Sequence, residues 1–312
     1  MSVNFYATTI SKWDQFASIT LSQKGQWIYR GQRKDKNWPL RTTLERALNN
    51  WSIDVANGPA IERQLVRDFR RRYRGGDQDR VDRDTLYCLA LMQHHGAPTR
   101  LLDWTYSPFV AAKNAIESGA KDGVVYCLNA QWCNQVVSKI VGDGAIRARN
   151  SDGLRNDSTF ISIYMTDPNR RRFVFNENPF HLNERLTIQQ GVFMCPGDIA
   201  SSFVDNITAM DGWEREENLL KICFQLDDEG IRDFAKVLVR MNIDSAALFP
   251  GLDGFSRSLG ERLFCTRILH YGGSEAQARK GPKFQISWLY VPLARPASMR
   301  EFTPHPPASR AA

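Results

Sequence analysis

Several features of common protein classes are missing from this sequence of 312 residues. No apolar run approaches the roughly 20 residues that cross a bilayer, so no membrane partner is expected. The six cysteines form no Cys-x-x-Cys pair, which argues against a zinc site and favours buried free thiols. The first residues lack a basic stretch followed by an apolar core. We therefore expect no secretory signal and a cytoplasmic protein.

The motifs of several enzyme classes are also missing. The spacing of Ser, His and Asp matches no hydrolase triad, and neither a metal-ligand cluster nor a phosphate-cradling glycine loop is present. The composition is that of a globular protein, with 42% hydrophobic and 24% charged residues. The net charge is +7, and 30 of the 41 basic residues are arginines, which bind phosphates with two parallel donors. An anionic partner is one interpretation, although such a charge is common in proteins that bind nothing acidic.

The central feature of the sequence is a polar loop between two predicted helices, at residues 92–108. Asp84 is expected to cap the helix before it, and Gly96 suits the left-handed residue that ends that helix. Ser107 followed by Pro108 predicts the start of the next helix. Within the loop lie chemically capable side chains, His94, His95, Thr99, Arg100 and Asp103. They either build a site or, through an Arg100–Asp103 pair, only brace the loop.

Two further segments carry arginines. Trp27, Ile28 and Tyr29 predict a strand that ends at Arg30, and Gly31 would let a ligand approach the backbone. The segment 59–73 predicts an amphipathic helix with six arginines between residues 63 and 74. These arginines could form a nucleic-acid face, but we favour the solvated side of a helix.

The remaining pattern predicts an α+β fold, a single large domain with a central mixed or antiparallel sheet flanked by helices. Strands are expected at residues 123–128, 183–195, 219–224 and 284–290, and a helix at 229–241. Residues 129–179 are expected to form a loop-rich insertion. The predicted organisation is an N-terminal docking segment (1–22), the main domain (23–260), a C-terminal extension with a strand (261–294) and a disordered tail (295–312).

Four blocks of this sequence resemble the FRG domain family, which is named for its Phe/Tyr-Arg-Gly motif. They are Tyr29-Arg30-Gly31, the loop from Gln93 to Trp104, Arg185 with the segment from Gln189 to Phe193, and the segment from Leu248 to Gly254. The resemblance implies a domain found largely in prokaryotes and their phages, covering residues 23–260 here.

The Tyr29-Arg30-Gly31 motif is also similar to the opening motif of ADP-ribosyltransferases. That resemblance implies an arginine that holds the phosphates of NAD, followed by a Ser-x-Ser strand and a glutamate that orients the nicotinamide ribose. Ser158-Thr159 with Ser162 matches the second motif poorly, and Glu216 before the strand at residue 219 could supply the third.

Three functional hypotheses remain open. The first is a nucleotide-directed enzyme, an NAD-dependent ADP-ribosyltransferase or glycohydrolase, with NAD as substrate rather than a bound cofactor. The second is a non-catalytic module that binds a nucleotide or nucleic acid, in prokaryotic or phage defence, and the third is a structural role for all four blocks. In the enzyme hypothesis His94 is the acid/base, Asp103 orients a partner, Glu216 is the acidic residue, and the substrate-binding residues are Tyr29, Arg30, Gly31, Thr99, Arg100, Arg185 and Gln190. If this is correct, Arg30, His94 or Asp103, and Arg185 should line one pocket.

Overall fold

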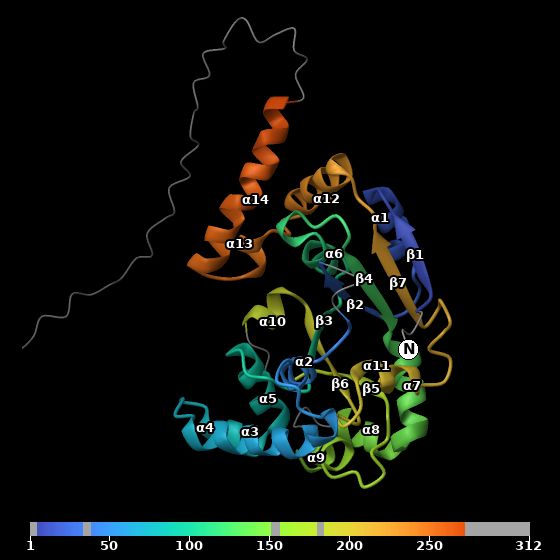
Figure 1. Ribbon diagram of the computed structural model, residues 1–312, viewed down its shortest axis with the longest axis vertical. Helices are drawn as coiled ribbons and strands as arrows, with labels where there is room; N and C mark the ends of the chain where they lie inside the picture. Colours follow the sequence, from blue (N-terminus) through green and yellow to red (C-terminus); the bar gives the residue numbers. More distant parts are fainter. Residues whose placement is uncertain (1–4, 34–38, 151–156, 180–183, 272–312) are drawn as a thin grey trace, which may run out of the picture. The chain divides into compact units, whose positions relative to one another are not determined.

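The computed structural model describes residues 5–33, 39–150, 157–179 and 184–271 (Figure 1). The residues up to His270 form one compact unit. The strands are β1 (Ala7–Ile10), β2 (Trp27–Gln32), β3 (Leu102–Thr105), β4 (Val124–Asn129), β5 (Val174–Glu177), β6 (Gly191–Pro196) and β7 (Leu219–Phe224). The helices are α1 (Trp13–Ser22), α2 (Thr43–Asn50), α3 (Gly58–Arg72), α4 (Gln78–Arg83), α5 (Thr85–His94), α6 (Pro108–Ala115), α7 (Ala130–Val141), α8 (Asp143–Asn150), α9 (Asp157–Tyr164), α10 (Glu184–Ile188), α11 (Phe203–Thr208), α12 (Asp228–Arg240), α13 (Ser245–Leu248) and α14 (Leu252–Tyr271), with short 3-10 turns η1 (Val55–Asn57) and η2 (Glu117–Gly119). None of the helices in these described ranges is both long and apolar enough to cross a membrane.

The strands form a single mixed sheet in the order β1-β7-β4-β2-β3-β6-β5, so the predicted α+β class is confirmed. β1 pairs with β7 in parallel, and the other neighbours are antiparallel. β2 pairs with β4 along its whole length, whereas its pairing with β3 is confined to Tyr29 and Thr105. The two central strands therefore separate beyond Tyr29, next to Arg30.

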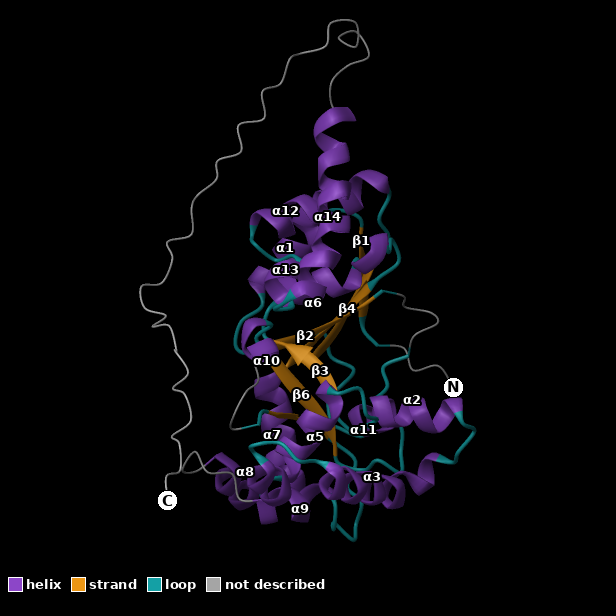
Figure 2. Ribbon diagram, turned by 90° about the vertical axis from the view of Figure 1, so that its left-hand side faces the viewer, coloured by secondary structure: helices purple, strands orange, loops and turns teal. Residues whose placement is uncertain are grey.

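Alternate residues of the sheet feed two hydrophobic cores, as the two-residue period of a strand requires. Trp27 and Tyr29 face the core that α1, α6 and α12 cover, where Phe16 and Phe234 are fully buried. Ile28 faces the larger opposite core, which α3, α5, α7 and α9 cover. Figures 1 and 2 show these helix groups on either side of the sheet. The sheet is thus the middle of three layers.

The local signals around the central loop are confirmed. The Asp84 carboxylate accepts a hydrogen bond from the Tyr87 backbone N–H at 2.9 Å and caps α5. Gly96 has a φ of +84°, which a residue with a side chain rarely adopts. The Ser107 hydroxyl accepts from the Val110 N–H at 3.3 Å, and Pro108 begins α6. The segment between the two helices is short and fixed at both ends, and it contains strand β3 where a loop alone was expected.

Other expectations differ from the structure. Residues 129–179 contain α7, α8, α9 and β5 where loops were expected. Residues 184–188 are helical, so the strand expected at 183–195 begins at Gly191. The N-terminal segment adds strand β1 as well as a helix, and α14 runs across the expected boundary at residue 260. The strand expected at 284–290 and the tail at 295–312 lie outside the described residues.

The described cysteines agree with the prediction of free thiols. Cys88, Cys127, Cys133 and Cys195 are buried, Cys223 is half-buried, and none of these five forms a disulfide bond. Burial raises the pKa of the Cys88 thiol to about 11, so it stays protonated at neutral pH. The cysteines therefore contribute apolar volume to the core rather than reactive groups.

Candidate functional site: an arginine-lined cavity

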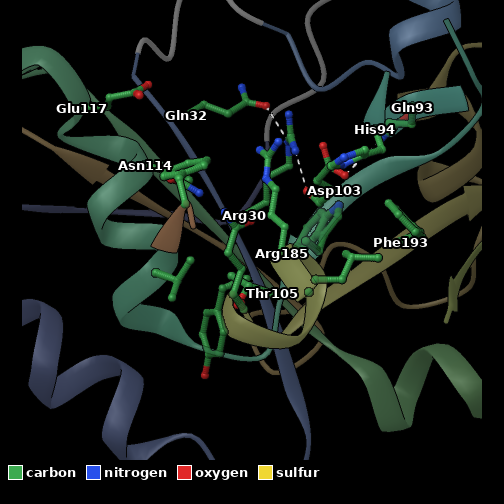
Figure 3. Close-up of a pocket in the computed structure, with 18 of the residues that line it drawn as sticks. Arg30, Gln32, Gln93, His94, Asp103, Thr105, Asn114, Glu117, Arg185 and Phe193 are labelled. Carbon is green, nitrogen blue, oxygen red and sulfur yellow. Dashed lines mark hydrogen bonds between the residues drawn. The ribbon is translucent and has the colours of Figure 1, made fainter. Parts of the chain in front are cut away.

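A cavity of about 490 Å³ opens where β2 and β3 separate, bordered by α5, α6, α10 and the α13–α14 segment (Figure 3). This volume lies within the range of small-molecule sites. Most of the charged groups around it are basic, namely Arg30, Arg33, Arg46, Arg185, Arg257 and, when protonated, His94, against the carboxylates of Asp103 and Glu117. The structure thus brings Arg30, His94, Asp103 and Arg185 to one cavity from four separate segments.

Arg30 lies at the point where the central strands separate. Its Nη1 donates to the backbone carbonyl of Asp103 at 2.5 Å, and its Nε donates to the Gln32 side chain at 3.1 Å. Burial lowers the pKa of Arg30 to about 10, while the nearby Asp103 carboxylate opposes that shift. The guanidinium therefore stays charged at neutral pH and is held in a fixed orientation.

The carboxylate of Asp103 is positioned by a chain of hydrogen bonds. Asp103 is the exposed residue of β3, between the buried Leu102 and Trp104. Gln93 Nε2 donates to Asp103 Oδ1 at 2.9 Å, and Gln93 Oε1 accepts from the hydroxyls of Thr99 and Thr43. With both ends of its amide engaged, Gln93 fixes the carboxylate at the cavity wall.

Arg46, from α2, borders the same carboxylate. Burial lowers the pKa of Arg46, and the charge of Asp103 opposes that shift. Arg46 also disfavours the charged form of Arg30, which means that the two guanidinium groups lie close enough to repel. A negatively charged ligand between them would relieve this repulsion.

His94 ends α5 at the rim of the cavity and is exposed. Partial desolvation lowers its pKa below the ordinary value of 6.5, and the neighbouring His95 and Arg185 lower it further. The imidazole is therefore neutral at pH 7 and able to accept a proton. The His95 ring lies 5.2 Å from the His94 ring, edge to face, and does not line the cavity.

Arg185 and Arg257, which also line the cavity, both contact the ring of Phe249. The Arg185 guanidinium lies 4.9 Å from the centre of the Phe249 ring, and the Arg257 guanidinium lies 5.3 Å from it. Cation–π contacts of this length orient a guanidinium while leaving its edge free to donate. One phenylalanine thus contacts an arginine from α10 and an arginine from α14.

Gly31 has a packing role that was not expected. A Cβ atom at this position would lie 1.8 Å from the backbone oxygen of Ala111 in α6. The glycine therefore allows α6 to approach β2 closely, and it also lines the cavity. This contact seats α6 beside the cavity.

Thr99 and Arg100 lie outside the cavity. Thr99 is fully buried and joins the loop to α2, because its carbonyl accepts from the Leu44 N–H at 2.9 Å. Arg100 is 1% exposed and forms a two-pronged ion pair with Glu62 of α3, and its Nη1 donates to the Tyr164 carbonyl at 2.8 Å. Arg100 therefore neither lines the cavity, as a substrate-binding residue would, nor forms the alternative brace with Asp103, because Glu62 pairs with it in the protein interior.

The remaining sequence candidates are scattered. Tyr29 lines the cavity, but its hydroxyl donates to Gln23 at 2.7 Å. Gln190, with a φ of 48°, turns the chain from α10 into β6, and Glu216 lies in an exposed turn where it raises the pKa of Tyr6. Ser158 and Ser162 lie on helix α9. None of the last four lines the cavity, so the second and third motifs of an ADP-ribosyltransferase are not assembled by these residues.

The cavity residues that were not singled out for this role from the sequence include Arg33, Arg46, Asn114, Glu117, Phe249 and Arg257. Phe249 lies within one of the four blocks and could have been found there. The others lie on helices or turns, where charged residues usually face solvent. Among the described residues, no group of three or more His, Cys, Asp or Glu side chains could hold a metal ion.

One family match covers the part of the chain that contributes the central residues of this cavity. Residues 25–123 match the FRG domain. The FRG-matching segment contains Arg30, Arg46, His94, Asp103 and Glu117, whereas Arg185, Phe249 and Arg257 lie beyond it. No curated protein and no solved structure matches the chain.

Proposed function

We propose that the cavity binds a nucleotide through its phosphate groups. The observation that carries this proposal is the convergence of five arginines on one cavity, against two carboxylates among its described lining residues. Arginine favours phosphate because its planar donors match two oxygens at once. The apolar side chains of Trp104, Val110 and Phe193 on the same walls suit a base or a ribose face.

NAD is the nucleotide that we propose as substrate, for an ADP-ribosyltransferase-like or glycohydrolase reaction. Arg30 of β2, beside the point where β2 and β3 separate, is the arginine to which the Tyr-Arg-Gly resemblance gives the phosphate-binding role. Asp103 and His94 are the carboxylate and the neutral base within the cavity, and they take the roles of orienting a ribose and moving a proton. Glu117, which faces Arg33 at 3.7 Å, is the second carboxylate available to such a reaction.

Isothermal titration with ADP-ribose, NAD and ADP tests the binding, and release of nicotinamide from NAD tests the reaction. Arg185→Gln should weaken binding, whereas Arg240→Gln, which changes an exposed arginine at the end of α12, should not. If the wild-type protein binds none of the three ligands, the nucleotide proposal is wrong. Binding of NAD without nicotinamide release would favour the non-catalytic module.

A second candidate function is nucleic-acid binding by α3. Arg63, Arg67 and Arg71 are exposed, recur every four residues and line a second hollow of about 470 Å³ with Ile161 and Met165. Their spacing places them in a row along one helix face, which suits a phosphate backbone. Arg70 differs from them, because its Nε and Nη2 donate to the Val81 carbonyl and the Thr85 hydroxyl.

The test is the salt dependence of binding to a fluorescent duplex of DNA or RNA. Changing Arg63, Arg67 and Arg71 together to Gln should reduce the slope of log K against log salt by about 2–3. Arg240→Gln is the matched surface control, and Arg70 is left unchanged because its loss would disturb the contact of α3 with α4 and α5. Equal slopes for the wild type and the triple variant would mean that these three arginines do not bind nucleic acid.

A further inference from the structure

Phe249 is held between two arginines that the FRG-matching segment does not contain. Because a stacked guanidinium uses its face on the ring, its N–H edge still points outward to donate. Both guanidinium groups contact the same ring and line the same cavity, so both can donate to an anion bound there. On this ground we propose that Arg185, Phe249 and Arg257 form a second phosphate-binding half of the cavity, which makes it selective for a diphosphate over a monophosphate. This inference rests on the proposed nucleotide binding.

The first half of the cavity is the Arg30–Arg46 pair beside Asp103, whose two guanidinium groups lie near each other. The second half comes from α10 and the α13–α14 segment, on the Phe249 side. A ligand with one phosphate satisfies one arginine pair. A ligand with two linked phosphates has oxygens for both, and each charge-assisted pair adds to the affinity.

The second half is built rigidly. Gln189 Nε2 donates to the Leu248 carbonyl at 3.0 Å and joins the end of α10 to α13. A Cβ atom on Gly254 would lie 1.8 Å from the Phe249 carbonyl oxygen, so α14 begins in direct contact with α13. The positions of Arg185 and Arg257 are therefore fixed relative to Phe249.

An ion pair joins this half to the FRG-matching segment. Lys113 of α6 is 8% exposed and binds the Glu261 carboxylate of α14 at 2.8 Å. The same carboxylate accepts from the Ser245 N–H at 3.0 Å and from the Ser245 hydroxyl at 2.6 Å. One carboxylate thus ties α6, α13 and α14 together beside the cavity. In this arrangement Phe249 is a positioning residue, and Arg185 and Arg257 are the groups that touch the ligand.

The experiment compares ADP with AMP, and inorganic pyrophosphate with inorganic phosphate, by isothermal titration on the full chain. The wild type should bind the diphosphates more tightly, by about tenfold or more. Arg257→Gln should remove most of that preference while changing the affinity for AMP by less than about threefold. Phe249→Leu should act like Arg257→Gln, Phe249→Tyr should keep the preference because the ring remains, and Arg240→Gln is the matched arginine control.

The outcomes separate the two proposals. Binding of ADP and AMP with equal affinity by the wild type, or an unchanged preference in both Arg257→Gln and Phe249→Leu, overturns the second half-site but leaves nucleotide binding standing. Absence of binding to all four probes overturns both. A preference that survives in Phe249→Tyr and disappears in Phe249→Leu, with equal melting temperatures, supports the aromatic contact as the positioning element.

Discussion

Replacing Arg30 with lysine separates the charge of this residue from its geometry. Two of the five N–H donors of the guanidinium bind Gln32 and the Asp103 carbonyl, and the others remain for a ligand. Lysine keeps the charge but loses the two parallel donors that match a phosphate. We expect nucleotide binding to weaken by about 1–3 kcal/mol, which corresponds to about 5- to 150-fold in Kd.

The same change should alter stability only moderately. The lost hydrogen bonds to Gln32 and Asp103 each contribute about 0.5–1.5 kcal/mol. In a domain of this size that corresponds to a decrease in Tm of roughly 2–6 °C. The assay is titration with NAD, ADP-ribose and ADP, and calorimetric melts of both proteins provide the folding control.

Three results would refute parts of this reasoning. A folded variant with an unchanged Kd would mean that Arg30 does not clamp a phosphate. An unfolded variant would mean that Arg30 has a structural role. In that case its hydrogen bond to the Asp103 carbonyl would hold β2 and β3 together where they lack strand pairing. If the wild-type protein bound no nucleotide, nucleic-acid binding by the arginines of α3 would become the favoured function.

Other predictions concern the support of the site. Glu62→Gln should destabilise the protein by about 3–5 kcal/mol in urea unfolding, because the buried Arg100 charge loses its counter-charge; a loss below 1 kcal/mol would mean that water reaches the pair. Gly31→Ala should cost about 1–3 kcal/mol, since the new methyl group would meet the Ala111 carbonyl, and an unchanged melt would mean that α6 moves away easily. Affinity for an anionic nucleotide should rise as the pH falls below 6.5, because a bound anion raises the lowered pKa of His94 and favours its charged form; His94→Asn should flatten this profile, and a pH dependence that persists in the variant would assign it to another group.

The parts of the fold that local chemistry determines could be predicted from the sequence. Asp84, Gly96 and Ser107 act within three residues of their own position, so both ends of α5 and the start of α6 followed from the sequence. The segment 184–188 was missed because Thr187 and Ile188 have strand propensity, while the tertiary contacts of α10 with β6 and α13 favour a helical turn.

The composition of the site was harder to predict. Arg30 and Asp103 could be proposed for the site because they stand in motifs that the sequence shows directly, although the structure places them within β2 and β3 rather than at a strand end and in a loop. Arg100 has the same chemistry, but its partner Glu62 lies 38 residues earlier, and only the packing of α3 shows that the pair is buried. Arg46 and Arg257 lie on helices, where most arginines face solvent, so their position at the cavity depends on tertiary contacts that the local sequence does not show.

The sheet order has a consequence for any fragment of this protein. Of the seven strands, the segment 25–123 contains only β2 and β3 in full, and these two are joined by the single pair Tyr29–Thr105. Both outer neighbours, β4 and β6, begin after residue 123. A polypeptide cut to the FRG-matching length would expose the unpaired edges of both strands, which are templates for aggregation. The stretch that carries the family resemblance is therefore not a unit of autonomous folding, and domain limits for expression are set by the complete sheet from β1 to β7.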